Sequence, residues 1–323
     1  MTFHITAAAD ENYVPFVGSL LHSICEHRPK NKAIAFHLLA NGVSEASIQQ
    51  LRMILGHNGD LFIHDISRLA DLLPSSIPPT IAITSYARLF LPSIIPAEVH
   101  TLLYLDCDTI INSELTPLSE MELEGHLAAG VLDTLPDEKS KTAIELPINA
   151  PYYNAGILLI NLKAWREENL QSAFLQYLSE KKGKVHHHDQ GILNHVLHGR
   201  WKTLPPQFNL TSNYFSHSYD YLKKRNTPFY SQYEIEHART VPCIIHYTEG
   251  FLVRPWVKGC KHPYKDVFLR HKEQTYWSKI PLKIDSRPLH VKILAWQFLH
   301  LPSWVYHLSV YILSCLARVF KHK

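Results

Sequence analysis

The sequence predicts an α/β fold with a mostly parallel central sheet and a basic, helical appendage at the C-terminus. Two observations support this. In the first half of the chain, strand-like and helix-like stretches alternate, which is typical of βαβ units. No acidic residue follows Asp285, whereas several arginines and lysines do. We therefore expect one large domain over residues 1–280 and a separate segment over residues 281–323.

The composition fits a globular protein. The 323 residues are 46% hydrophobic and 19% charged, which allows a substantial core and excludes a disordered chain. The net charge of +3 is modest, and we expect no nucleic acid partner. The five cysteines contain no C-x-x-C pair, so neither a disulfide framework nor a zinc knuckle is indicated. The start, MTFHITAAAD, does not read as a signal peptide, and we expect a cytoplasmic protein.

The first half is expected to supply the parallel strands. In order, we predict a strand over 3–8, a helix over 13–27, a strand over 33–39, a helix over 44–56 capped by Ser44, and a strand over 61–66. A proline-rich loop around Pro74, Pro78 and Pro79, a helical stretch over 85–91 and an apolar strand over 101–105 follow.

The second half is expected to add one apolar strand and two helices. The strand covers 156–162, and the helices cover 164–181 and 190–197. From about Thr203 the pattern becomes irregular and rich in Pro, Tyr and His. Ligands of open α/β sheets bind outside the carboxyl ends of the strands, so polar residues that directly follow strands are the candidates for a site.

Two aspartates at the end of an apolar strand are the sharpest local feature. Asp106 and Asp108 follow the strand over 101–105, and in an extended chain their side chains share a face about 7 Å apart. Two carboxylates after a buried strand are costly unless a cation compensates them. An oxygen-rich site with open positions suits Mg²⁺ or Mn²⁺. A D-x-D tripeptide alone is nevertheless a common chance occurrence.

His246 is a candidate third ligand, because it ends another apolar, strand-like run. An imidazole ligand favours Mn²⁺ over Mg²⁺. The chain has 22 histidines, most of which must be ordinary, so a structural role for His246 stays open. Gly250 and Arg254 follow, and they could bring backbone amides and a guanidinium to a phosphate.

The end of the first strand offers a site for a nucleoside. Ala8 and Ala9 are small enough to let a flat base approach the sheet edge, and Asp10 and Asn12 match the polar edge of a uracil or a ribose. A plain helix cap by Asp10 explains the same residues equally well.

Two further polar groups lie beside apolar elements. Asn154, in an N-A-G sequence, and the pair Asp189 and Gln190 could grip sugar hydroxyls, or they could be a turn and a helix cap. The three consecutive histidines over 186–188 cannot point one way on a regular element, so we expect a polar loop there and no metal site.

Taken in order, these segments resemble the retaining glycosyltransferases of family 8, most closely the bacterial lipopolysaccharide galactosyl- and glucosyltransferases. The matching stretches are AAADENY, ITSYARLFLP, LLYLDCDTII, LTPL, YYNAGILLINLKAW, DQGILN, the FN at Asn209, HYTEG and RPW. They spread over about residues 3–265. An ordered set of this kind is far more specific than any single motif.

The resemblance implies a single Rossmann-like nucleotide-binding domain of the GT-A type, and Mn²⁺ dependence with Mg²⁺ as the alternative. It implies a UDP-hexose donor, carrying galactose or glucose with retention of configuration, and an oligosaccharide or lipopolysaccharide acceptor. Carried over by position, the metal ligands are Asp106, Asp108 and His246, and the uridine site is Ala8, Ala9, Asp10 and Asn12, with Arg88 reaching the donor. The sugar-binding group is Asp133, Asn154, Asp189 and Gln190, and the diphosphate clamp is Gly250 with Arg254.

The resemblance leaves the reaction step partly open. Gln190 is expected near the far face of the reacting carbon, with Asp189 and Arg88 completing the catalytic group. An amide is a poor nucleophile, so front-face attack is the working hypothesis. The usual lysine of the clamp is Arg254 here, whose fork could bind a diphosphate differently. Only the backbone of Cys107, between the two aspartates, is expected to matter.

The C-terminal segment is expected to bind a membrane surface. From Pro288 it is dense in aromatic, leucine and basic residues, and Pro302 interrupts it, so a spanning helix is not expected. One helical face carries the apolar residues Leu308, Ile312, Cys315, Leu316 and Val319. We expect a peripheral anchor on anionic lipid at the inner face of a bacterial cytoplasmic membrane. The alternative is a helix that packs on the protein's own core.

Two other functions compete with sugar transfer. One is a catalytically silent, membrane-associated protein that binds sugar nucleotides. The other is a sugar-nucleotide pyrophosphorylase, which would ordinarily show a glycine-rich phosphate loop near the first strand. No such loop follows the first predicted strand in this sequence.

Overall fold

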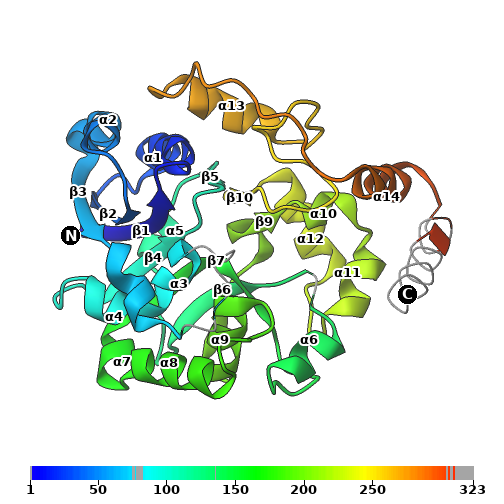
Figure 1. Ribbon diagram of the computed structural model, residues 1–323, viewed down its shortest axis with the longest axis horizontal. Coiled ribbons are helices and arrows are strands. Elements are labelled where there is room, and N and C mark those ends of the chain that lie inside the picture. The colour runs from blue at the N-terminus through cyan, green and yellow to red at the C-terminus, as the bar shows by residue number, and fades with distance from the viewer. Residues whose placement is uncertain are drawn as a thin grey trace.

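A seven-stranded mixed sheet forms the centre of the chain. The computed structural model describes residues 2–74, 77, 83–134, 136–302, 305, 308 and 309. In the sheet, the strand order is β3-β2-β1-β4-β7-β6-β8 (Figure 1). The strands are β1 (Thr2–Asp10), β2 (Ala33–Asn41), β3 (Gly59–Asp65), β4 (Thr101–Leu105), β6 (Ala128–Leu132), β7 (Tyr153–Asn161) and β8 (Trp201–Thr203).

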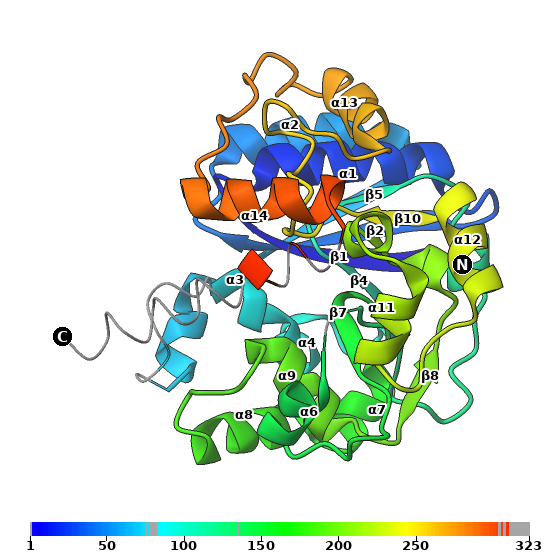
Figure 2. The same ribbon diagram turned by 90° about the vertical axis from the view of Figure 1, so that its right-hand side faces the viewer.

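The predicted α/β class and the mostly parallel sheet are confirmed. The parallel pairs are β1–β2, β2–β3, β1–β4 and β6–β8, and only β7 pairs antiparallel, with β4 and β6. Figure 2 shows α1 (Val14–His27), α2 (Glu45–Leu55) and α13 (Lys265–Glu273) on one side of the sheet. On the other side lie α7 (Leu162–Glu167), α8 (Leu170–Glu180) and α9 (His188–Val196). Strands covered on both faces are apolar along most of their length.

A second, three-stranded sheet was not predicted. It has the order β5-β10-β9, with β5 (Thr109–Ile111), β9 (Leu210–Thr211) and β10 (Ile244–His246). These strands are too short to show a period of two in the sequence. The antiparallel pairing of β10 with β5 places His246 opposite Thr109, directly beyond the two aspartates. This small sheet therefore carries a residue from late in the chain to the end of β4.

Most of the predicted helices of the first half are confirmed. Both α1 and α2 begin within one residue of their predicted starts, and the hydroxyl of Ser44 caps α2 by accepting from the backbone N–H of Ser47. The predicted helix over 85–91 is instead α3 (Ile83–Tyr86), a 3₁₀ turn η3 (Ala87–Phe90) and α4 (Leu91–Ile94). Pro78 and Pro79 of the predicted loop lie outside the described residues.

The single helix predicted over 164–181 is wrong. The chain forms α7 and α8 there, separated at Asn169, whose φ of 51° is left-handed. Asparagine tolerates that conformation better than most residues, and a left-handed residue ends the α-helical hydrogen-bond pattern. The amphipathic period runs on through the break, which is why the sequence pattern does not show it.

The region after Thr203 is more regular than predicted. Its helices are α10 (Asn213–Ser216), α11 (Tyr219–Arg225), α12 (Gln232–Thr240), α13 and α14 (Leu289–His300). Two of them begin at side-chain caps, Ser218 on α11 and the capping box of Ser231 and Glu234 on α12. The remaining helices are α5 (Thr116–Ser119), α6 (Glu138–Ala143), η1 (Gly56–Asn58), η2 (Ser67–Leu72) and η4 (Pro206–Phe208).

Helix α14 packs on the rest of the chain by one face. The ring centroid of Phe298 lies 4.4 Å from that of Phe251 and 4.6 Å from that of His217, and Figure 1 shows α14 beside α11. Among the described residues, none of the helices combines the length and the apolar character needed to cross a membrane. Of the apolar face predicted near the C-terminus, only Leu308 lies within the described residues, and it is exposed.

Three buried histidines make stability depend on pH. Burial lowers the pKa of His37 to about 3 and the pKa values of His217 and His262 to about 4. In the unfolded chain these groups bind protons below about pH 6.5, whereas in the folded chain they stay neutral until their lower pKa values are reached. The free energy of unfolding should therefore fall as the pH drops from about 6.5 to 4, by about 1.4 kcal/mol per pH unit for each histidine.

Urea unfolding at pH 7 and pH 5 measures this loss. We expect the wild type to lose several kcal/mol, a large part of the ~5–15 kcal/mol available to a typical domain. In His37→Asn, the free energy of unfolding should change with pH less steeply, by about 1.4 kcal/mol per pH unit. His198→Asn, at an exposed position, should change with pH as the wild type does. Equal stability at both pH values in the wild type would contradict the burial of neutral histidines.

Candidate active site

The ends of β4 and β10 bring two carboxylates and an imidazole together. Nε2 of His246 lies 3.1 Å from Oδ1 of Asp108 and 3.9 Å from Oδ2 of Asp106. The three ligand atoms all lie within 4.8 Å of one another. The structure thus assembles the three residues that the sequence singled out as metal ligands, although His246 is far from the aspartates along the chain.

Neighbouring groups hold the outer oxygen of each carboxylate. Oδ1 of Asp106 accepts from Nη2 of Arg88 at 2.8 Å and from the hydroxyl of Tyr104 at 3.1 Å. Oδ2 of Asp108 accepts from Nη2 of Arg254 at 3.2 Å. Each carboxylate therefore keeps its other oxygen free of these partners and directed towards His246.

A chain of hydrogen bonds fixes the tautomer of His246. Oδ1 of Asn154 accepts from the backbone N–H of Gly156 at 3.0 Å, so its amide orientation is determined. Because that same oxygen lies 2.9 Å from Nδ2 of Asn209, the carbonyl of Asn209 must face His246. Nδ1 of His246, 2.9 Å from this carbonyl, then carries a proton, and the lone pair of the neutral ring lies on Nε2.

The electrostatics of the site favour a cation at Nε2. Burial by itself disfavours the protonated ring of His246, yet Asp108 and Asp106 raise its pKa above the ordinary value. Burial also disfavours ionised Asp108, but His246 and Arg254 hold its pKa below the usual range. A proton and a metal ion therefore compete for the same position between the two carboxylates.

Gly156 leaves room beside the ligands. A Cβ atom there would overlap Cε1 of His246 and would lie 2.8 Å from Oδ2 of Asp106. Two carboxylate oxygens, one imidazole nitrogen and this space form a donor set that fits a divalent cation such as Mn²⁺ or Mg²⁺. The residues present therefore fit the metal that the resemblance implies.

Replacing Asn209 by alanine tests the role of the amide that orients His246. The change removes the acceptor of the Nδ1 proton, and we expect Mn²⁺ affinity to fall about 10–100-fold. Asn58→Ala is the control, since that amide donates to the carbonyl of Leu55, away from the metal ligands. Calorimetric titration with Mn²⁺ measures both variants. Wild-type affinity in folded Asn209→Ala would show that the amide does not orient the ligand.

A cavity of about 190 Å³ opens beside the metal ligands, between the ends of β1 and β4. Of the residues predicted to bind the donor, it is lined by Ala8, Asp10, Arg88, Asp106, Cys107, Asp108 and Arg254. Asp10 also accepts a hydrogen bond from the backbone N–H of Tyr13 at 3.1 Å, so its turn-forming and cavity-lining roles coexist. The Cys107 thiol donates to the carbonyl of Ala8 at 2.9 Å, so more than its backbone matters.

Of the residues predicted for the uridine site and the diphosphate clamp, Ala9, Asn12 and Gly250 do not line this cavity. Ala9 is buried within β1, because its side chain points to the opposite face from that of Ala8. Asn12 lies in the turn after β1 and lines a neighbouring cavity with Glu11. Gly250 lines a third cavity, where its carbonyl accepts from Nη1 of Arg287 at 3.1 Å, and it also lines a further cavity together with Arg254.

The predicted sugar-binding residues form one hydrogen-bonded group behind the metal ligands. Nε2 of Gln190 donates to Oδ2 of Asp133 at 2.8 Å, and Oε1 of Gln190 accepts from the N–H of Ala155 at 3.0 Å. Nδ2 of Asn154 donates to the same oxygen of Asp133 at 3.3 Å. Through Asn154 this group joins the hydrogen-bond chain that reaches His246.

Arg88 and Asp189 are buried together. Nε of Arg88 lies 3.1 Å from Oδ2 of Asp189, and its guanidinium lies over the ring of Tyr104 and also donates to the carbonyl of Ala155. Burial raises the pKa of Asp189 above its usual value, and Arg88 opposes this. Arg88 is only 5% exposed, and its guanidinium pairs with both Asp106 and Asp189.

Sequence reasoning missed the roles of Asn209, Gly156 and Tyr104. Asn209 and Gly156 lie in stretches that carried the family resemblance, but their contacts with His246 join segments that are far apart in sequence. Of the three histidines predicted to form a polar loop, His186 and His187 lie in a turn and His188 begins α9, with the Tyr152 hydroxyl 2.8 Å from Nδ1 of His187. Among the described residues, no candidate metal cluster includes them.

Three comparisons relate the chain to known proteins. The family model described as glycosyl transferase family 8 matches residues 4–260. A lipopolysaccharide 1,2-glucosyltransferase of Escherichia coli is 28% identical over 290 residues, covering 87% of this chain and 81% of that protein. General stress protein A of Bacillus subtilis is 24% identical over 284 residues, covering 86% and 95%. The crystal structure of the galactosyltransferase LgtC with donor and acceptor sugar analogues superposes with a TM-score of 0.70 at 26% identity, covering 85% and 96%.

Proposed function

Because the chain belongs to glycosyltransferase family 8, we propose that it transfers galactose or glucose from a UDP-hexose, with retention of configuration and with Mn²⁺, or Mg²⁺ as the alternative. The acceptor in this proposal is a lipopolysaccharide core or a similar oligosaccharide. The names of the glucosyltransferase and galactosyltransferase relatives support the hexose and the acceptor.

One observation carries the proposal: Asp106, Asp108 and His246 converge at the edge of a cavity beside the end of β1. A divalent metal bound there supplies positive charge to the diphosphate as UDP leaves. Arg254 lies in the same cavity and already pairs with Asp108, so its guanidinium adds to that stabilisation. Arg88 and Tyr104 keep Asp106 in a fixed geometry, which avoids reorganisation during the reaction.

The sugar-binding group supports front-face attack. Both polar atoms of the Gln190 amide are engaged, one with Asp133 and one with the backbone of Ala155. Asp189 is paired with Arg88. An engaged amide and a paired carboxylate are poor nucleophiles, so these residues orient the hexose while the acceptor hydroxyl attacks from the side that UDP leaves.

The acceptor is proposed to bind in the adjacent cavity of about 500 Å³. It is lined by Asn213, His217, Tyr221, Gly250, Phe251 and Arg287, among others. Aromatic faces with a few polar groups suit a sugar ring and its hydroxyls. Arg287 belongs to the C-terminal segment over 281–323, so this segment contributes to the acceptor cavity in the proposal.

The outer face of α14 is proposed to contact an anionic membrane surface on the cytoplasmic side. Leu289, Ile293 and Trp296 share this face and are 73%, 48% and 55% exposed. We expect the double change Ile293→Ser and Trp296→Ser to reduce sedimentation with vesicles rich in phosphatidylglycerol, and to leave UDP binding unchanged. Tyr233→Ser removes an exposed aromatic residue elsewhere and serves as the control. Undiminished vesicle binding by the double variant would contradict this contact.

Donor binding tests the proposal. Titration of UDP-galactose, UDP-glucose and UDP-N-acetylglucosamine into the Mn²⁺-loaded protein should give tightest binding for galactose or glucose. Chelation of the metal by EDTA should remove most of the affinity, because the diphosphate then meets two carboxylates with no metal ion between them. If none of the three UDP-sugars binds in a metal-dependent way, the proposed donor is wrong.

A further inference from the structure

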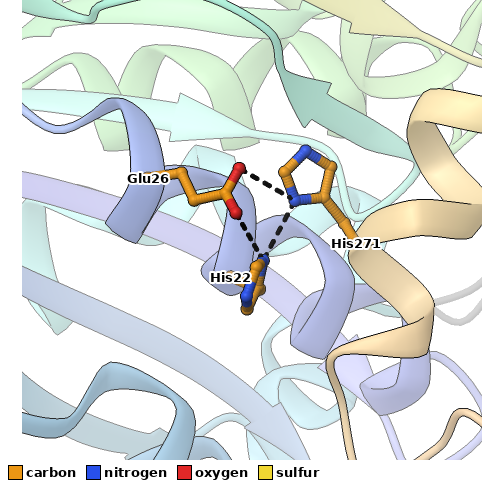
Figure 3. A group of neighbouring side chains, drawn as sticks. All are labelled: His22, Glu26 and His271. Carbon is orange, nitrogen blue, oxygen red and sulfur yellow. Dashed lines mark hydrogen bonds and ion pairs between the residues drawn. The ribbon is translucent and has the colours of Figure 1, made fainter.

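A second cluster of metal-ligating side chains lies between α1 and α13 (Figure 3). His22 and Glu26 are one turn apart on α1, and His271 reaches them from α13. Nδ1 of His22 lies 3.0 Å from Nδ1 of His271 and 3.9 Å from Oε1 of Glu26. Nδ1 of His271 lies 3.8 Å from Oε2 of Glu26.

These separations suit a small divalent metal with imidazole and carboxylate ligands. Zinc bonds of about 2.0–2.2 Å in a tetrahedral arrangement put ligand atoms about 3.4 Å from one another. The three observed separations, two of which run to different oxygens of Glu26, lie on either side of that value. With one ligand atom from each residue, the three atoms lie within 4.8 Å of one another, and the three side chains point to a common centre in Figure 3. The side chains of His22 and Glu26 are 21% and 42% exposed, so water can reach a fourth position.

The two imidazoles face each other through nitrogen atoms that can bind a metal ion. Two facing Nδ1 atoms at 3.0 Å need a proton or a metal ion between them. Nη2 of Arg270 lies 3.2 Å from Nε2 of His271 and, as a donor, favours the tautomer with the proton on Nδ1.

We propose that His22, Glu26 and His271 bind a zinc ion that fastens α13 to α1. In this site the proton of His271 moves from Nδ1 to Nε2, and Arg270, whose side chain is 58% exposed, turns away into solvent. A water molecule completes the tetrahedral set. The cavities described above border none of the three ligands, so the role of this ion is structural and its site is separate from the sugar-transfer site.

A zinc ion between α1 and α13 would also stabilise the segment that carries Arg254. Phe268 of α13 packs against Trp256 and Phe16, with ring centroids 5.2 Å and 6.3 Å apart. Trp256 is two residues beyond Arg254 in the chain. An ion that holds α13 on α1 therefore helps to hold the arginine beside Asp108.

The test uses the full chain with Asp106→Asn and Asp108→Asn, which removes two ligands of the other metal site. Titration with Zn²⁺ against a chromophoric chelator should give one equivalent bound per chain, and Zn²⁺ should raise the Tm. Co²⁺ in the same protein should give the intense visible absorption of a tetrahedral ion. Absence of stoichiometric zinc binding would overturn the proposal.

Single changes identify the ligands in that background. His22→Gln and Glu26→Gln should each weaken zinc binding at least ~100-fold, more than the loss of an outer-shell partner does. His198→Gln, at an exposed position elsewhere, should leave it unchanged. Arg270→Gln should tighten it, because the competing donor to His271 is gone. If His22→Gln leaves the zinc affinity unchanged, the ion binds at other residues and the proposal is overturned.

Discussion

Replacing Asp108 by asparagine is expected to lower kcat/KM for sugar transfer by about 1,000-fold or more. The change keeps the size of the side chain and removes the charge that pairs with Arg254 and faces Nε2 of His246. Without this carboxylate the site loses a metal ligand, and the charge that develops on UDP loses its main compensation. Steady-state rates of UDP release at saturating Mn²⁺ measure the effect.

Asp60→Asn is the matched control, because Asp60 is exposed on β3 away from the site. It should leave the rate within about twofold of the wild type, as most surface changes do. The circular dichroism of both variants should match the wild type. A folded Asp108→Asn variant that keeps more than a tenth of the wild-type kcat/KM would show that Asp108 is not a ligand the reaction needs.

Adding one methyl group at Gly156 is expected to abolish metal binding at the donor site. In Gly156→Ala, Cβ would occupy the space now held by Cε1 of His246 and would lie 2.8 Å from Oδ2 of Asp106. One of the two ligands must move, and a displacement of about 1 Å is enough to spoil the geometry that metal and substrate require. We expect Mn²⁺ affinity and kcat/KM to fall at least ~100-fold.

Gly130→Ala is the control for a glycine within the same sheet. Its Cβ would lie 3.2 Å from an atom of the Trp201 ring, a close contact that a small movement of the ring relieves. This variant should keep Mn²⁺ affinity and activity. If Gly156→Ala folds and still binds Mn²⁺ as tightly as the wild type, the three ligands do not converge as described.

The sequence predicts the strands that carry the site because these strands are apolar and end abruptly. The end of β1 at Asp10 and the end of β4 before Asp106 are both visible as a change from apolar to polar residues. Parallel neighbours in a sheet bring such ends to one edge, so the meeting of Ala8, Asp10 and Asp106 follows from local pattern and general topology.

The placement of His246 could not be predicted in this way. It depends on β5, β9 and β10, which have only two or three residues each and form by pairing with one another. Strands of that length carry no periodicity of their own. The apolar run before His246 made it a candidate ligand, but only the resemblance to a family indicated that it joins Asp106 and Asp108.

The contacts that hold the metal ligands in place could not be predicted from the sequence either. The hydrogen bonds from Asn209 to Asn154 and from Arg88 to Asp106 join distant segments through side-chain geometry, which a single sequence does not encode locally. The cluster of His22, Glu26 and His271 between α1 and α13 could not be predicted from the sequence for the same reason. The spacing of His22 and Glu26 puts them on one helix face, but nothing near His271 in the sequence indicates that it completes the set.

Release of UDP from UDP-galactose or UDP-glucose by the purified protein, with and without Mn²⁺, tests the central claim most directly. We expect slow release of UDP, which EDTA should stop and a suitable oligosaccharide acceptor should accelerate. The Asp108→Asn variant should release no UDP. A protein that binds these UDP-sugars but releases no UDP, with any acceptor or metal, would be a silent sugar-nucleotide binder and would contradict the proposed transfer.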